Sequence, residues 1–481
     1  MAEKSIKSKV TSGLFWSYGE RITAQLISLL VSVILARLLE PENYGVISIV
    51  MIFITLCNAL TTGGFGNALV QKKNPDDLDF STVLVISLAG SSLLYVLLFA
   101  CAPWIADFYN MPQLVPVLRV LGIRVIISGV NSVQHAHVQK DMAFKKFFFS
   151  TLLGTAVSAV VGIVMAHMGF GVWALVAQYL TNSTINMIVL HLTNKRGIGL
   201  RFSLARAKGL FSYGWKVWLT TIVYTIEGNI RSLIIGKKFG SADLAFYDQG
   251  KKYPELIVTN INSSISKVMF PALSGCQDDL PRMKQLCRRA VRVGVFVLAP
   301  ALIGLIAVAD TFVEVFLTVK WLPCVPFMRV LTIVFLVRPL TTTCQQSIMA
   351  IGRSDITLKI EIILNSLALV LLSVAVFVFE SPILIAWSNV VTECVSLALF
   401  MFYTKKLIAY KHSEQLQDIF PAIALSCIMG GIVIMLSRIL MNKMLLLLVQ
   451  ISVGALFYAV AAYLLKLDSM KYLVDIIRRK R

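Results

Sequence analysis

The sequence predicts an all-α integral membrane protein with about 14 transmembrane helices. Of its 481 residues, 57% are hydrophobic and only 15% are charged, and the mean hydropathy is +0.78. A water-soluble protein would leave much of this apolar surface exposed. The apolar residues also gather into runs of about 18 residues or more, which is the length that an α-helix needs to cross a hydrocarbon core of about 30 Å.

Fourteen such runs follow one another along the chain. They lie at residues 14–36, 46–66, 80–102, 114–134, 147–167, 170–192, 211–235, 253–273, 290–309, 324–349, 358–379, 383–403, 419–440 and 444–465. The fourth, seventh, eighth and tenth runs contain charged residues and are the weakest of the set. The first run follows three lysines, as in a signal peptide, but it is too long and lacks a small-residue cleavage site, so we expect a retained helix.

The distribution of basic residues predicts the orientation of these helices. With the N-terminus in the cytoplasm, 29 of the 45 Lys and Arg residues fall in cytoplasmic segments, 8 in outer segments and 8 within the helices. Cytoplasmic loops of membrane proteins carry this excess of positive charge. We therefore expect both termini in the cytoplasm, and the net charge of +20 needs no nucleic-acid partner to explain it.

Short connections and missing motifs exclude several classes of protein. No connection exceeds about 20 residues, which leaves no room for a soluble catalytic domain, and no Walker-type phosphate loop or dinucleotide fingerprint occurs. The eight cysteines form no Cys-x-x-Cys pair. His135 and His137 are two residues apart, which on a helix points their rings to different faces. We expect neither an enzyme nor a metal site, and no cofactor.

Three short segments recur in the same order, which indicates an internal duplication. The matched segments are 13–19 with 209–214, 37–42 with 238–243, and 116–123 with 326–333. The last pair shares the pattern Pro-x-x-Arg-Val-Leu-x-Ile. Each repeat would contain six helices, and because six is even, both repeats enter the membrane with the same orientation.

The duplication predicts three parts of the chain. The first is an N-lobe at residues 1–200 with helices 1–6, and the second is a C-lobe at residues 201–405 with helices 7–12. The third is a C-terminal pair, helices 13–14, with a basic tail at residues 406–481. The two lobes would be related by an axis along the membrane normal.

Several segments resemble those of the Wzx-type polysaccharide flippases, within the multidrug, oligosaccharidyl-lipid and polysaccharide exporter superfamily. They are residues 13–19, 36–45, 169–176 and 270–274. The resemblance covers nearly the whole chain and is closest to the colanic acid exporter branch. Glu40 stands where many relatives have Gly, in a loop that carries no expected function.

The resemblance implies a transporter of the bacterial inner membrane. Its expected substrate is an oligosaccharide repeat unit on undecaprenyl diphosphate, moved from the cytoplasmic to the periplasmic leaflet for exopolysaccharide or lipopolysaccharide O-unit biosynthesis. The expected partners are this lipid-linked substrate, membrane lipids and other polysaccharide assembly proteins. The alternatives are a multidrug or cation antiporter of the same superfamily and a membrane glycan polymerase or ligase.

Charged residues within the helices are the candidate site. A cation at mid-membrane costs about 2.5–3.5 kcal/mol on insertion scales, so such residues are expected to face the protein interior. Arginine binds phosphate oxygens through paired hydrogen bonds. The candidate substrate-binding residues are Arg124, Arg338, Arg119, Arg329, Arg21 and Arg231. The candidates for ion coupling are Glu393, Glu227 and Glu20.

Each candidate has a structural alternative. Glu227 and Arg231 are four residues apart, the spacing of an ion pair along a helix. Arg119, Arg124, Arg329 and Arg338 would otherwise serve lobe packing or extend towards the membrane surface. Glu20 and Arg21 would otherwise make a contact between the lobes. Glu393 has no cation within one turn, so it would either exchange ions or act as a hydrogen-bonded packing residue.

Overall fold

The computed structural model describes residues 2–62, 65–72, 75–194, 199–437 and 442–470. Every regular element in these ranges is helical, and 11 helices or helix pairs are long and apolar enough to cross a membrane. The predicted class, an all-α integral membrane protein, is confirmed. Each of the fourteen expected runs falls largely within helices of the described structure, although α8, α9 and α10 are not among these 11.

The chain divides into two compact units, Met1–Ala245 and Phe246–Arg481. The helices of the N-terminal unit are α1 (Ala2–Leu38), α2 (Pro41–Thr62), α3 (Phe65–Gln71), α4 (Asp77–Tyr109), α5 (Leu114–Leu121), α6 (Ile123–Lys140), α7 (Phe144–His167), α8 (Val172–Thr193) and α9 (Leu204–Lys238). The predicted lobe boundary at residue 200 is earlier than this division, because α9 packs along α2, α3 and α4.

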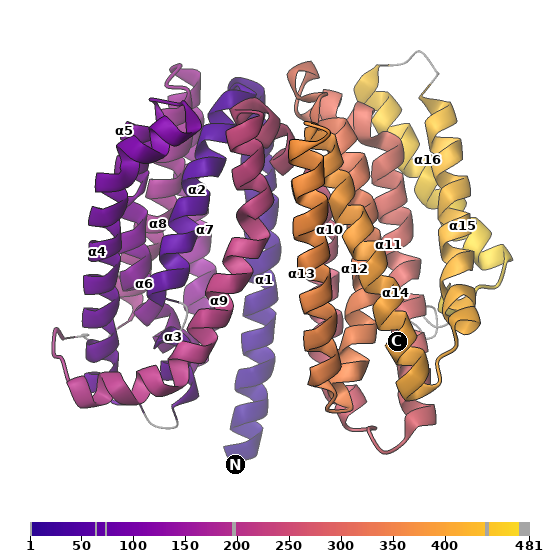
Figure 1. Cartoon of the computed structure of the whole chain (residues 1–481), viewed down its shortest axis with the longest axis horizontal. Coiled ribbons are helices and arrows are strands. Elements are labelled where there is room, and N and C mark those ends of the chain that lie inside the picture. The colour runs from indigo at the N-terminus through magenta and orange to yellow at the C-terminus, as the bar shows by residue number, and fades with distance from the viewer. Residues whose placement is uncertain (1, 63–64, 73–74, 195–198, 438–441, 471–481) are drawn as a thin grey trace. The chain divides into compact units, whose positions relative to one another are not determined.

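The C-terminal unit begins within α10 (Ser241–Ser274). Its other helices are α11 (Leu280–Phe316), the 3₁₀-helix η1 (Val319–Trp321), α12 (Cys324–Ala350), α13 (Ser354–Phe377), α14 (Pro382–Ile408), α15 (His412–Leu436) and α16 (Lys443–Leu464). In each unit the long helices run side by side (Figure 1). α11 packs against α12, α15 and α16, so the C-terminal helix pair is part of this unit's core.

Polar side chains fix several helix ends. Asp76 caps α4 by accepting a hydrogen bond from the backbone N–H of Asp79, whose carboxylate accepts one from the backbone N–H of Asp76. The first bond holds the pKa of Asp76 below its ordinary value. Lys72 pairs with Asp79 at 2.6 Å, and Arg206 pairs with Asp76 at 2.9 Å. An ion-pair network therefore joins the connection before α4 to the first turn of α9 at one end of the bundle.

A close backbone contact joins α2 to the first turn of α10. A Cβ atom built on Gly45 would lie 1.8 Å from the backbone carbonyl oxygen of Ser241. No side chain fits there without moving one of the two helices. The contact explains why the residue after Tyr44 is a glycine.

We expect Gly45→Ala to lower the melting temperature of the purified protein by about 1–3 °C, because overpacking costs about 1–3 kcal/mol and the unfolding entropy of a chain of this length is about 1 kcal/mol/K. Gly209→Ala is the matched control, since a Cβ at that helical position meets nothing within 4 Å. Thermal unfolding in neutral detergent measures both variants. Equal melting temperatures for the two variants would contradict the close contact.

Candidate functional site

The N-terminal unit contains a polar pocket of about 440 Å³ between α2, α3, α6 and α8. The lining residues are Asn58, Gly66, Arg124, Ser128, Asn131, Ser132, His135, Ala136, Gln139, Asn182, Ser183 and Asn186. Ten of these twelve have polar side chains and none is acidic. The pocket therefore offers one permanent cation and many neutral hydrogen-bonding groups within a helical bundle.

Six polar residues of α6 line the pocket from one face of the helix. They are Arg124, Ser128, Asn131, Ser132, His135 and Gln139, spaced at three, four or one residues, as the 3.6-residue period requires for neighbours on one face. Val125 and Val133, on other faces, are fully buried. Most of this polar stripe is uncharged, so a search for charged residues does not find it, although its helical spacing can be read from the sequence.

Arg124 lies in the first turn of α6 and is partly buried. Its Nε donates to Ser183 Oγ at 2.8 Å, and its Nη1 donates to Met51 Sδ at 3.2 Å. The guanidinium also lies over the Tyr179 ring, 5.4 Å from the ring centroid. Thioether sulfur is a weak acceptor, and no carboxylate among the described residues pairs with Arg124. The guanidinium is thus held in place while its charge is left uncompensated.

The amide N–H groups near Arg124 donate only long hydrogen bonds, although Asn186 also hydrogen bonds with His135. Asn182 Nδ2 donates to Ser158 Oγ at 3.4 Å, and Asn186 Nδ2 donates to Ser150 Oγ at 3.4 Å, both longer than the usual range. Asn131 Oδ1 is buried and accepts no hydrogen bond from the described residues. A buried acceptor without a donor costs about 1–3 kcal/mol. The pocket therefore has hydrogen-bonding capacity that a ligand can use.

In the C-terminal unit the structure brings Arg338 of α12 close to Glu393 of α14, and the two side chains interact electrostatically. Thr341, one turn after Arg338, hydrogen bonds with the Glu393 carboxylate. Arg338 also lies over the Phe335 ring at 5.8 Å. Glu393 has no cation within one turn of its own helix, because its partner comes from a residue 55 positions earlier in the chain.

Arg119 and Arg329, which match in the predicted duplication, make the same kind of contact. Arg119 Nε donates to the carbonyl oxygen of Phe99 at 3.4 Å, and its guanidinium lies over the Phe99 ring. Arg329 Nε donates to the carbonyl oxygen of Ile306 at 3.3 Å, and its Nη2 pairs with Asp310. Each arginine thus ties its helix to the preceding long helix, which favours the packing role.

The remaining candidates lie apart from the polar pocket. Glu20 accepts a hydrogen bond from Thr151 Oγ1 at 2.9 Å, which joins α1 to α7, and its neighbour Arg21 is exposed. Glu227 is exposed, and no ion pair joins it to Arg231 in the described structure of α9. Arg231 Nε is buried without a hydrogen bond to the described residues.

Comparison with known proteins relates the chain to polysaccharide biosynthesis. Residues 34–326 match the family described as "Polysaccharide biosynthesis protein". Lipopolysaccharide biosynthesis protein WzxC of Escherichia coli (strain K12) is 24% identical over 362 residues, 74% of this chain and 73% of that protein. Teichuronic acid biosynthesis protein TuaB of Bacillus subtilis (strain 168) is 24% identical over 467 residues, 94% of this chain and 95% of that protein.

Solved structures show the same fold. Lipid II flippase MurJ in an inward closed conformation has a TM-score of 0.73 at 14% identity, over 94% of this chain and 99% of that one. An inward-facing multidrug resistance MATE family transporter of the MOP superfamily has a TM-score of 0.62 at 17% identity, over 80% and 95% of the two chains. The predicted resemblance is confirmed: the family match extends over more than half of the sequence, and the chain belongs to the polysaccharide biosynthesis protein family.

Proposed function

We propose that the protein flips an oligosaccharide linked to undecaprenyl diphosphate from the cytoplasmic to the periplasmic leaflet by alternating access. The observation that carries this proposal is the uncompensated Arg124 among neutral amides and hydroxyls. A diphosphate ester carries about two negative charges and accepts charge-assisted hydrogen bonds, whereas sugar hydroxyls both donate and accept. The pocket offers complementary groups for both parts of such a ligand.

Family membership and the names of similar proteins support this substrate class. WzxC and TuaB are named for lipopolysaccharide and teichuronic acid biosynthesis, and MurJ is named a lipid II flippase. We infer a location in the bacterial inner membrane, with both termini cytoplasmic and with other polysaccharide assembly proteins as partners. The membrane potential would favour outward movement of the diphosphate by about 2.3 kcal/mol per uncompensated charge per 100 mV.

The pocket chemistry separates this proposal from one of its rivals. A transporter of cationic drugs would use acidic groups, and none lines the pocket. A polymerase or ligase would act chemically on the glycan, and we propose instead that the glycan crosses the membrane unchanged. Charge complementarity therefore favours an anionic lipid-linked substrate over a cation.

Arg338 and Glu393 are the proposed second contact and its coupled carboxylate. The carboxylate and an anionic ligand would compete for the same guanidinium, so binding of the diphosphate to Arg338 would release Glu393 from it. The released carboxylate could then take up a proton or a sodium ion. The electrostatic interaction across α12 and α14 supports this arrangement.

We expect Arg124→Gln to slow flipping of the lipid-linked oligosaccharide in reconstituted vesicles by about 10-fold or more, because a hydrogen bond to a charged group contributes about 1.5–3 kcal/mol. Arg353→Gln is the control, since this arginine pairs with Asp355 outside the polar pocket. Flipping is measured as the fraction of substrate accessible from the outer leaflet. A wild-type rate in Arg124→Gln would remove Arg124 from the site.

Asn131→Leu separates recognition of the glycan from that of the diphosphate. We expect affinity for the glycan-bearing lipid to fall by about 2- to 10-fold, the effect of one neutral hydrogen bond, while affinity for sugar-free undecaprenyl diphosphate stays the same. The melting temperature should stay equal or rise, because an unsatisfied buried acceptor is removed.

The control for Asn131→Leu is Asn229→Leu, which removes an amide that donates to Thr225 O within α9. Binding of both lipids to each variant is measured in detergent. An equal loss of affinity for the two lipids, or a large loss of stability, would contradict a glycan-binding role for Asn131.

A further inference from the structure

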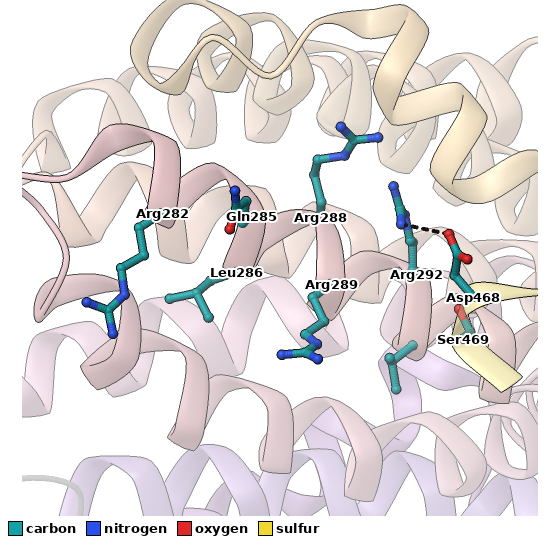
Figure 2. Close-up of a pocket in the computed structure, with 9 residues that line it drawn as sticks. Arg282, Gln285, Leu286, Arg288, Arg289, Arg292, Asp468 and Ser469 are labelled. Carbon is teal, nitrogen blue, oxygen red and sulfur yellow. Dashed lines mark hydrogen bonds and ion pairs between the residues drawn. The ribbon is translucent and has the colours of Figure 1, made fainter. Parts of the chain in front are cut away.

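A second pocket, of about 550 Å³, lies at the beginning of α11 in the C-terminal unit (Figure 2). We call it the basic pocket. Its lining residues are Arg282, Gln285, Leu286, Arg288, Arg289, Arg292, Val293, Asp468 and Ser469. Four arginines thus face one aspartate, and the transport proposal uses none of these residues.

The length of α11 sets the level of the basic pocket in the membrane. α11 has 37 residues, which at 1.5 Å per residue gives about 55 Å. A hydrocarbon core is only about 30 Å thick. The residues after Val293 suffice to cross it, so the arginine-bearing turns extend into the headgroup region. The distribution of basic residues predicts that this end is cytoplasmic.

On one side of the first turns of α11, arginines form ion pairs with acidic side chains of neighbouring helices. Arg288 pairs with Asp418 at 2.7 Å and with Glu414 at 3.2 Å, both on α15. Arg292 pairs with Asp418 at 2.6 Å and with Asp468, which follows α16, at 3.3 Å. Asp418 also accepts a hydrogen bond from the Tyr410 hydroxyl. Burial of Tyr410, and after it this hydrogen bond, raise the pKa of Tyr410 well above its ordinary value. These pairs join α11, α15 and the end of α16 into a fixed frame.

The other arginines extend away from this frame. Figure 2 shows Arg288 and Arg292 pointing to one side of α11 and Arg282 and Arg289 pointing to the other. Arg282, Gln285 and Arg289 are exposed. Arg282 and Arg289 are seven residues apart, two turns and about 10 Å along the axis, on the same face of the helix. They form a positive surface too wide for one phosphate ion.

The charges and the depth together identify a ligand class. Four arginines and one aspartate line the pocket, so positive charge prevails on the lining. Leu286 and Val293 add apolar surface beside it. Basic pockets at the cytoplasmic ends of transmembrane helices suit anionic lipid headgroups. We propose that the basic pocket binds the phosphate groups of an anionic phospholipid of the cytoplasmic leaflet.

Lipid binding to the full-length protein tests this proposal without requiring transport. The delipidated protein is titrated in neutral detergent with cardiolipin, phosphatidylglycerol or phosphatidylcholine, and bound lipids are counted by native mass spectrometry. We expect cardiolipin and phosphatidylglycerol to bind more tightly than phosphatidylcholine. Arg282→Gln/Arg289→Gln should weaken cardiolipin binding by about 10-fold or more, and higher salt should weaken wild-type binding.

The matched control is Lys405→Gln/Lys406→Gln, which removes two exposed cations from the last turn of α14 in the same unit. This variant should bind cardiolipin as the wild type does. Arg288 and Arg292 stay unchanged in both variants, so the frame on Asp418 is kept. The charge-reversed Arg282→Glu/Arg289→Glu protein should bind less cardiolipin than the glutamine variant, with a similar melting temperature.

Three results would overturn the proposal. The first is equal cardiolipin affinity in the wild type and in Arg282→Gln/Arg289→Gln. The second is an equal loss in the Lys405→Gln/Lys406→Gln control, which would indicate unspecific surface charge. The third is displacement of cardiolipin by inorganic phosphate or by undecaprenyl diphosphate at a lower concentration than by phosphatidylglycerol, which would assign the pocket to a free anion or to the transported lipid.

Discussion

The unpaired charge of Arg124 is the constraint on which the candidate site depends. A cation within a membrane bundle is tolerated only where neighbouring groups replace water. Here Ser183, Met51 and Tyr179 hold the guanidinium in place and leave its charge unneutralised. The polar stripe on α6 continues this environment along the helix. The same groups that make the charge tolerable therefore also prepare the pocket for an anion that carries hydroxyl groups.

The helices could be predicted from the sequence because the thickness of the hydrocarbon core imposes a minimum apolar length. Runs such as 80–102 and 147–167 lie wholly within α4 and α7. The boundary between the two units was harder to predict from the sequence. α9 matches the first helix in the predicted duplication, but it packs with α2, α3 and α4 of the N-terminal unit. Sequence similarity reports common origin, whereas packing depends on which apolar faces meet.

The site was only partly predictable, for a physical reason. A charged residue in an apolar run is expected to face protein. Its place in the sequence does not show whether its side chain lines a pocket or donates a hydrogen bond to a backbone carbonyl. Arg124 reaches the polar pocket, while Arg119, five residues earlier, donates to Phe99 O. Neutral residues such as Asn131 carry no charge signal and become visible only when the period of α6 is considered. Partners from distant helices, such as Arg338 for Glu393, need the tertiary structure.

The long amide contacts at Asn182 and Asn186 have a consequence for selectivity. At 3.4 Å these donors are weakly engaged, so each can change its acceptor at little energetic cost. A lining of this kind discriminates poorly between epimers, because moving one hydroxyl alters one weak bond among several. The fixed guanidinium would then recognise what all candidate cargoes share, and the choice among repeat units would fall to the enzymes that build them.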